Sequence, residues 1–271
     1  MISSRCGLRT VLVFIVLLVC APFGRQALAQ LSCAEWRASG DGPSPGVTRR
    51  EFAISYYMGS TRTRASSLTI SQPALATQIK FEGVRYRGKS FDGPLYYGIR
   101  GGMFTGRFPA LGFEAELVHL KVFTEPTQRV SAGGTHLGQP VNGQLPLGEI
   151  VQRFSISHGV NLLLVNVVGR YRIKADPQGR RSRFILEARF GAGPTLPHTE
   201  STIDGQPQEQ FEVGRFAFQL GSGAKVRLKR TLYTLIEYKF TRTRQRGRVF
   251  MGEAESLLLS HHGILGLSYH F

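Results

Sequence analysis

Apolar and polar residues alternate along most of the chain after residue 50, so that successive side chains point to opposite faces. Within 51–60, for example, Phe52, Ile54, Tyr56 and Met58 share one face. Runs of about ten residues with this period, rich in Phe, Tyr, Val and Gly, are typical of the strands of a membrane barrel. Seven further runs are found at 95–105, 111–123, 159–173, 184–193, 215–228, 232–241 and 257–271. The pattern predicts eight β-strands.

One face of most runs is apolar, whereas the opposite face combines charge with glycine. We expect the charged faces to meet in ion pairs inside a closed barrel, because backbone groups in hydrocarbon must all be paired. Eight strands leave a lumen that side chains can fill, which predicts a plugged barrel and excludes a general porin. The inward charges are expected to be Glu114, Glu116, Glu187 and Glu237 with Arg100, Arg170, Arg172, Arg189, Arg215 and Lys239.

The connections between the runs alternate in length. Short ones lie at 106–110, 174–183 and 229–231, and long ones at 61–94, 124–158, 194–214 and 242–256. The fold class predicted for 51–271 is therefore all-β: an eight-stranded antiparallel transmembrane β-barrel with short periplasmic turns and long extracellular loops. A soluble lipocalin-like barrel is the alternative, but it would need its apolar faces inward.

Both ends of the chain carry export features. Residues 1–29 combine Arg5 and Arg9, an apolar run and an Ala27-Leu28-Ala29 cleavage site, as a secretory signal peptide does. The apolar run is too short for a membrane anchor. Phe271 ends the last alternating run and resembles the assembly signal of bacterial outer-membrane proteins, which implies the assembly machinery as a partner. We expect residues 30–50 to form a periplasmic segment and the mature protein to reside in the bacterial outer membrane as a monomer.

The formal charge of +16 changes the picture only after export is considered. Loss of Arg5, Arg9 and Arg25 with the signal peptide lowers it to +13. A basic chain favours an anionic partner. Because the protein is exported, we exclude nucleic acid and expect that partner to be an anionic membrane lipid, lipopolysaccharide.

Four segments near the long connections resemble one known group. In order they are GKSFDGPLYYGIR, GFEAELVHLKVF, GVNLLLVN and GAGPTLPHTE. They are similar to segments of the lipid A oxidases, outer-membrane barrels of rhizobia and related bacteria, over roughly residues 80–200 and the terminal strand. The chain departs from that pattern at His158, where an acidic residue is expected.

The resemblance implies an oxidation by molecular oxygen that converts the proximal glucosamine of lipid A to an aminogluconate. Such chemistry implies a divalent metal ion or another oxygen-activating group as cofactor, and imidazole with carboxylate suits Mn, Fe, Cu or Zn. The candidate ligands are His119, His158, His198 and Glu200. The candidate catalytic residues are His119, Lys121, His158, Asn161 and His198. Histidines at a barrel rim can equally be hydrogen-bonding loop residues, and both interpretations stay open.

Candidate contacts to the lipid A substrate are Ser90, Tyr96, Arg100, Asn166, Arg242, Arg244 and Arg246. For Arg100 and Asn166 the alternative is a hydrogen-bonding role inside the lumen, and for Tyr96 it is a plug of the lumen. Arg242, Arg244, Arg246 and Arg248 alternate with other residues, so a strand extension would direct all four to one face, where Arg binds phosphate well. Such a contact needs no catalysis, so a non-catalytic structural or adhesive barrel that holds lipopolysaccharide is the second hypothesis.

Overall fold

The computed structural model describes residues 50–93, 95–175 and 182–271, with every side chain except those of 156–159 and 175. The predicted signal peptide and the predicted periplasmic segment up to residue 49 lie outside these residues. None of the described residues forms a helix that is long and apolar enough to cross a membrane.

Eight antiparallel strands form a closed ring. In ring order they are β1 (Glu51–Thr63), β5 (Tyr97–Phe104), β6 (Leu111–Thr124), β9 (Val151–Ala175), β10 (Ser182–Ile203), β12 (Phe216–Lys229), β13 (Leu232–Val249) and β14 (Gly252–His270). The ring closes where β1 pairs with β14, in register from Ala53↔His270 to Thr63↔Ser260. Each predicted run lies on one of these strands, so the predicted barrel is confirmed.

The outer wall near the chain's C-terminus is apolar. Large hydrophobic side chains are exposed there on every strand of the ring, among them Ile54, Ile99, Phe113, Val165, Phe190, Phe218, Ile236 and Leu265. Their inward neighbours are mostly polar or charged. This inside-out arrangement identifies a transmembrane barrel and excludes the lipocalin-like alternative, in which the apolar faces would point inward.

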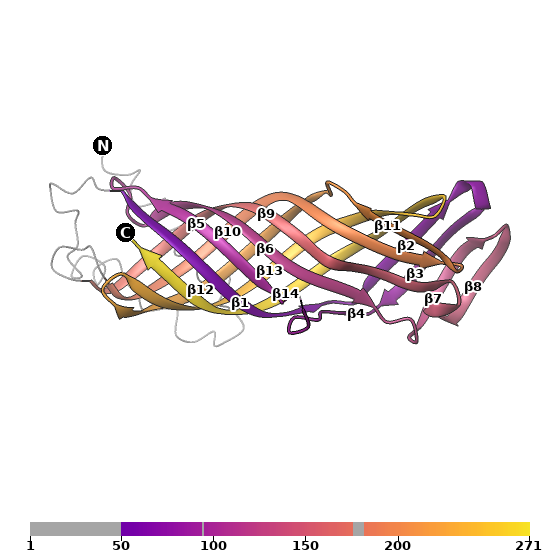
Figure 1. Ribbon diagram of the computed structural model, residues 1–271, viewed down its shortest axis with the longest axis horizontal. Coiled ribbons are helices and arrows are strands. Elements are labelled where there is room, and N and C mark those ends of the chain that lie inside the picture. Colours follow the sequence, from indigo (N-terminus) through magenta and orange to yellow (C-terminus); the bar gives the residue numbers. More distant parts are fainter. Residues whose placement is uncertain (1–49, 94, 176–181) are drawn as a thin grey trace, which may run out of the picture.

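The long connections are built mainly of strands, not of the irregular loops that the sequence suggested (Figure 1). They contain β2 (Ser66–Gln72), β3 (Thr77–Val84), β4 (Tyr86–Arg87), β7 (Arg129–His136), β8 (Gln139–Pro146) and β11 (Gln206–Phe211), with 3-10 turns at Pro73–Leu75 and Leu147–Glu149. β2, β3, β7 and β8 continue the sheet from the edge of β14. The expected loop at 242–256 is a continuous hairpin of β13 and β14. We call the part of the molecule formed by these strands and turns, together with the hairpin at 242–256, the extension.

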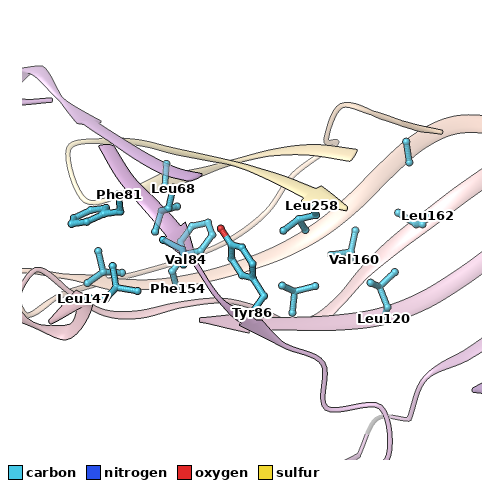
Figure 2. Packing of buried hydrophobic residues seen from close by; sticks show 14 of the residues in the cluster. Leu68, Phe81, Val84, Tyr86, Leu120, Leu147, Phe154, Val160, Leu162 and Leu258 are labelled. Atoms are coloured by element: carbon cyan, nitrogen blue, oxygen red, sulfur yellow. The ribbon is translucent and has the colours of Figure 1, made fainter. Parts of the chain in front are cut away.

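The extension has an apolar core, which continues into the ring at Leu120 and Leu162 (Figure 2). Figure 2 shows its packing: Leu68, Phe81 and Val84 face Leu147 and Phe154 across the interior. Tyr86 is part of this core, where its hydroxyl lies 2.5 Å from Ser256 Oγ, and burial raises its pKa above the ordinary value. The charged inward faces predict a polar lumen along the whole barrel. The network of buried charges is in fact confined to the half nearer the short turns, and the interior of the extension combines apolar side chains with uncharged polar ones such as Thr199, Ser201 and Gln245.

The half of the barrel nearer the short turns contains a balanced ion network. Its buried acids are Glu114, Glu116, Glu187 and Glu237, and its buried bases are Arg100, Arg189, Lys225 and Lys239. The predicted ion pairs are therefore confirmed for three of the bases, and Lys225 is added to them. Arg170 and Arg172 instead pair with Glu51, and Arg215 is on the outer wall, where it pairs with Glu255. Both halves are filled, so the barrel is plugged.

Candidate functional site

Three residues predicted to contact substrate lie inside the barrel. Arg100, Asn166 and Tyr96 are each no more than 2% exposed. Arg100 bonds to two lumen glutamates, Asn166 donates to Glu116 at 2.9 Å, and the Tyr96 hydroxyl lies 3.1 Å from His262 Nδ1. Their polar groups are used within the lumen, where a lipid headgroup on the outer wall does not reach them. The structure thus places them in the lumen roles that the sequence left open as alternatives.

His119 belongs to a small polar cluster on the outward face of β6. It is directly opposite Tyr97 on β5 and Asn161 on β9. Its Nδ1 lies 2.9 Å from Asn161 Oδ1, and its ring stacks on Tyr97 with centroids 5.1 Å apart. Its Nε2 is buried and has no hydrogen-bond partner among the described residues. The cluster therefore offers one free imidazole nitrogen at the border of the apolar wall nearer the extension.

Lys121, two residues after His119 on β6, contacts the segment that precedes β5. Its Nζ donates to the backbone carbonyls of Asp92 and Gly93, at 3.2 and 2.5 Å. Ser90 of the same segment accepts from the Thr61 amide at 3.1 Å, which ties the segment to β1. His119 and Asn161 are thus in direct contact, whereas Lys121 and Ser90 hold the segment at residues 90–93 against β6 and β1.

A second cluster lies on the hairpin of β10 and β11. His198 and Glu200 are on one face of β10, and Glu200 is directly opposite Glu209 of β11. Among the described residues, these three form a group whose ligand atoms all lie within 4.8 Å of one another. His198 Nε2 is 2.8 Å from a Glu209 carboxylate oxygen, and Glu200 pairs with Arg153 of β9. Sequence reasoning missed Glu209 because only the hairpin register brings it to this face.

The four predicted metal ligands do not form one group. His119 on β6 is separated from β10 by β9, because its neighbour Asn161 in turn pairs with Leu196. The described group of three contains His198 and Glu200 but not His119. His158 is on β9, and its side chain lies outside the described residues. The structure thus brings the candidate ligands to two places on the wall.

The arginines of β13 form a ladder on the outer wall. Arg242, Arg244, Arg246 and Arg248 are exposed, while Thr243, Gln245, Gly247 and Val249 between them are buried. This confirms that the alternation directs all four to one face. Three of the ladder residues have acidic neighbours: Arg244 and Arg246 pair with Glu255 and Glu253, and Arg248 pairs with Glu212.

Arg242 is the ladder arginine nearest the apolar wall and has two neighbouring arginines, Arg62 on β1 and Arg64 directly after its end. Leu259 of β14 is paired with Arg242 on one side, and its carbonyl accepts from the Arg64 amide on the other. Arg62, also exposed, pairs in register with His261 just below. In the described part of the chain these three arginines have no carboxylate within ion-pair distance. Sequence reasoning missed Arg62 and Arg64, although their alternation continues that of the first predicted run.

No protein-family model matches the chain, and no curated protein matches its sequence. Solved structures of similar shape include Neisserial surface protein A (8% identity, TM-score 0.39, covering 83% of this chain and 99% of that one). Others are the outer membrane protease OmpT of Escherichia coli (12%, 0.36, 84% and 99%) and the outer membrane protein AlkL in lipid bilayers (12%, 0.38, 85% and 94%). At these identities and TM-scores the likeness does not identify a function.

Proposed function

We propose that the protein is a bacterial outer-membrane barrel that holds lipopolysaccharide against its outer wall. The observation that favours this function is a trio of arginines, Arg62, Arg64 and Arg242, that border the apolar wall and have no ion-pair partner among the described residues. Lipopolysaccharide carries phosphates on the sugars to which its acyl chains are attached. A bound molecule would therefore meet these arginines with its headgroup and the exposed apolar side chains with its acyl chains.

The spacing of the trio suits a phosphate. Arg64 and Arg242 flank β14, so their backbones are about 10 Å apart at the usual spacing between neighbouring strands. Two arginine side chains that lean toward each other over Leu259 would reach one phosphate group. Arginine binds phosphate through two parallel hydrogen bonds, which favours it over lysine at such a site.

Arg244 and Arg246, which lie further from the apolar wall along β13, would extend the contact. Arg244 and Arg246 are about half exposed even though they pair with glutamates, at 3.4 and 3.3 Å. Exposed pairs of this kind are worth about 0–1 kcal/mol, so a phosphate or acidic sugar can displace them at little cost. We assign the trio to the phosphates of lipid A and these two arginines to more distant anionic groups.

Lipid-dependent stability tests this function. The barrel is refolded in bilayers with and without lipid A, and its thermal unfolding is followed by heat-modifiable migration on gels. We expect lipid A to raise the midpoint of the wild type but not that of an Arg62→Gln, Arg64→Gln, Arg242→Gln triple variant, because only a ligand that binds the folded state stabilises it. The matched control is Arg107→Gln, Arg183→Gln, Arg230→Gln, which removes three exposed arginines near the short turns. Equal stabilisation of all three proteins would refute the site.

A second candidate function is the oxidation of lipid A, and one observation favours it. Within the part of the chain that the structure describes, His119 Nε2 is buried and has no hydrogen-bond partner, while Asn161 fixes the ring through Nδ1. A free imidazole nitrogen of this kind is suited to accept the proton of a sugar hydroxyl. Oxidation of glucosamine C1 from a hemiacetal to a carboxyl removes two electrons and adds one water oxygen, and molecular oxygen would accept the electrons with two protons as hydrogen peroxide.

Mass spectrometry of lipid A separates the two candidates. Cells with the gene are compared with cells that lack it, with and without oxygen. A gain of one oxygen atom that needs both the gene and oxygen, and that His119→Ala abolishes while the barrel still inserts, supports the oxidase. The matched control is His261→Ala, an outward-facing histidine of β14 that bonds to Tyr238. Identical lipid A profiles in cells with and without the gene would exclude the oxidase, and the non-catalytic function would be the remaining candidate.

A further inference from the structure

The hairpin of β10 and β11 juxtaposes an imidazole and two carboxylates on one outward face. Glu200 and Glu209 are direct cross-strand partners, and His198 is two residues before Glu200 on the same face. Like charges directly opposite each other destabilise an antiparallel pair. An arrangement of this kind calls for a cation between the two carboxylates, and Arg153 of β9 supplies one by its pair with Glu200.

We propose that His198, Glu200 and Glu209 form a binding site for a divalent transition-metal ion, and that Arg153 occupies the acidic pair when no metal is bound. One imidazole and two carboxylates suit Zn²⁺, Mn²⁺ or Fe²⁺ better than Ca²⁺, which prefers oxygen ligands alone. The site is independent of the arginine trio, which lies on other strands of the barrel.

The ligand atoms must draw closer to bind an ion. At metal–ligand bonds of about 2.0–2.2 Å, two ligands of a tetrahedral ion are about 3.4 Å apart, whereas here the three atoms lie within 4.8 Å of one another. The Glu209 side chain is 66% exposed, so it can shift without disturbing the buried interior. His198 is 2% exposed, and its ring stacks on Phe211 with centroids 3.8 Å apart, which fixes the direction of its nitrogens.

The surroundings leave room for further ligands. A cavity of about 260 Å³ adjoins the cluster and is lined by Arg153, Glu200 and Glu209 among others. Three protein ligands leave at least one coordination position open, which water can fill from this cavity. The site would therefore be an open one.

A Co²⁺ titration of the untagged, refolded barrel tests the proposal, with binding followed by the visible absorption of the ion. We expect one saturable site in the wild type, an affinity at least about tenfold lower in Glu209→Gln, and a higher affinity in Arg153→Gln, which loses the competing cation. Glu209 is exposed, so its variant should fold. The matched control is Glu253→Gln, an exposed glutamate of the β13–β14 hairpin that pairs with Arg246.

Three results would overturn the proposal. The first is the absence of saturable Co²⁺ binding in the wild type. The second is equal affinity in Glu209→Gln and Glu253→Gln, since the hairpin carboxylate would then have no part in binding. An unchanged or lower affinity in Arg153→Gln would remove the competing role of that arginine.

Discussion

Arg100 and Glu116 are cross-strand partners of β5 and β6 whose side chains meet inside the barrel, with Nη2 donating to Oε1 at 2.9 Å. Both side chains are no more than 1% exposed. Glu116 also accepts from Lys239, Tyr57, Asn166 and Gln219. This one carboxylate is therefore the anion around which the ion network of the lumen is organised.

Replacement of Glu116 should destabilise the barrel strongly. Glu116→Gln leaves Arg100 and Lys239 with one buried negative charge fewer, and the loss of one partner of a buried pair costs about 3–5 kcal/mol. We expect a fall of that size in the free energy of unfolding, measured by urea denaturation in detergent. Glu255→Gln, which removes a partly exposed carboxylate on the outer wall, should change it by less than about 1 kcal/mol. Similar losses in the two variants would contradict the central role of Glu116.

Two glycines of β5 offer a matched test of packing around Tyr57. A Cβ on Gly98 would lie 2.0 Å from the Tyr57 ring, whereas a Cβ on Gly101 would have no atom within 4 Å. Gly98→Ala should therefore lower the free energy of unfolding by about 1–3 kcal/mol or more through overpacking, and Gly101→Ala should leave it nearly unchanged. The same urea titration measures both. Equal stability of the two variants would mean that the interior is less tightly packed than described.

Because its interior is filled, the barrel should not conduct ions. The ion network closes the half of the barrel near the short turns, and the apolar core around Phe81 and Phe154 closes the extension. In planar lipid bilayers the refolded protein should give no steady open channel. Sustained conductance at the level of a general porin would show that the plug opens.

The sequence was sufficient to predict the ring because lipid outside and charge inside impose a period of two on every strand. It did not predict the extension, although β3 has the same period, with Ile79 and Phe81 buried between exposed polar neighbours. The strands β2, β3, β7 and β8 of the extension are at most eight residues long, which is too short for the pattern to stand out from a loop.

The sequence allowed both a lumen role and a substrate contact for Arg100 and Asn166, and only the positions of their partners, Glu116 and Glu237, decide for the lumen. Arg64 was missed because it reaches Arg242 across strands that are far apart in the chain. Glu209 was missed because its strand, β11, lies in a connection that the sequence predicts as a loop.

Native mass spectrometry of the barrel released from membranes that contain lipopolysaccharide tests the proposed function most directly. The wild type and the control variant at Arg107, Arg183 and Arg230 should each retain bound lipid A, and the variant at Arg62, Arg64 and Arg242 should lose it. Equal retention of lipid A by all three proteins, or none by the wild type, would contradict the proposal that the arginine trio holds lipopolysaccharide.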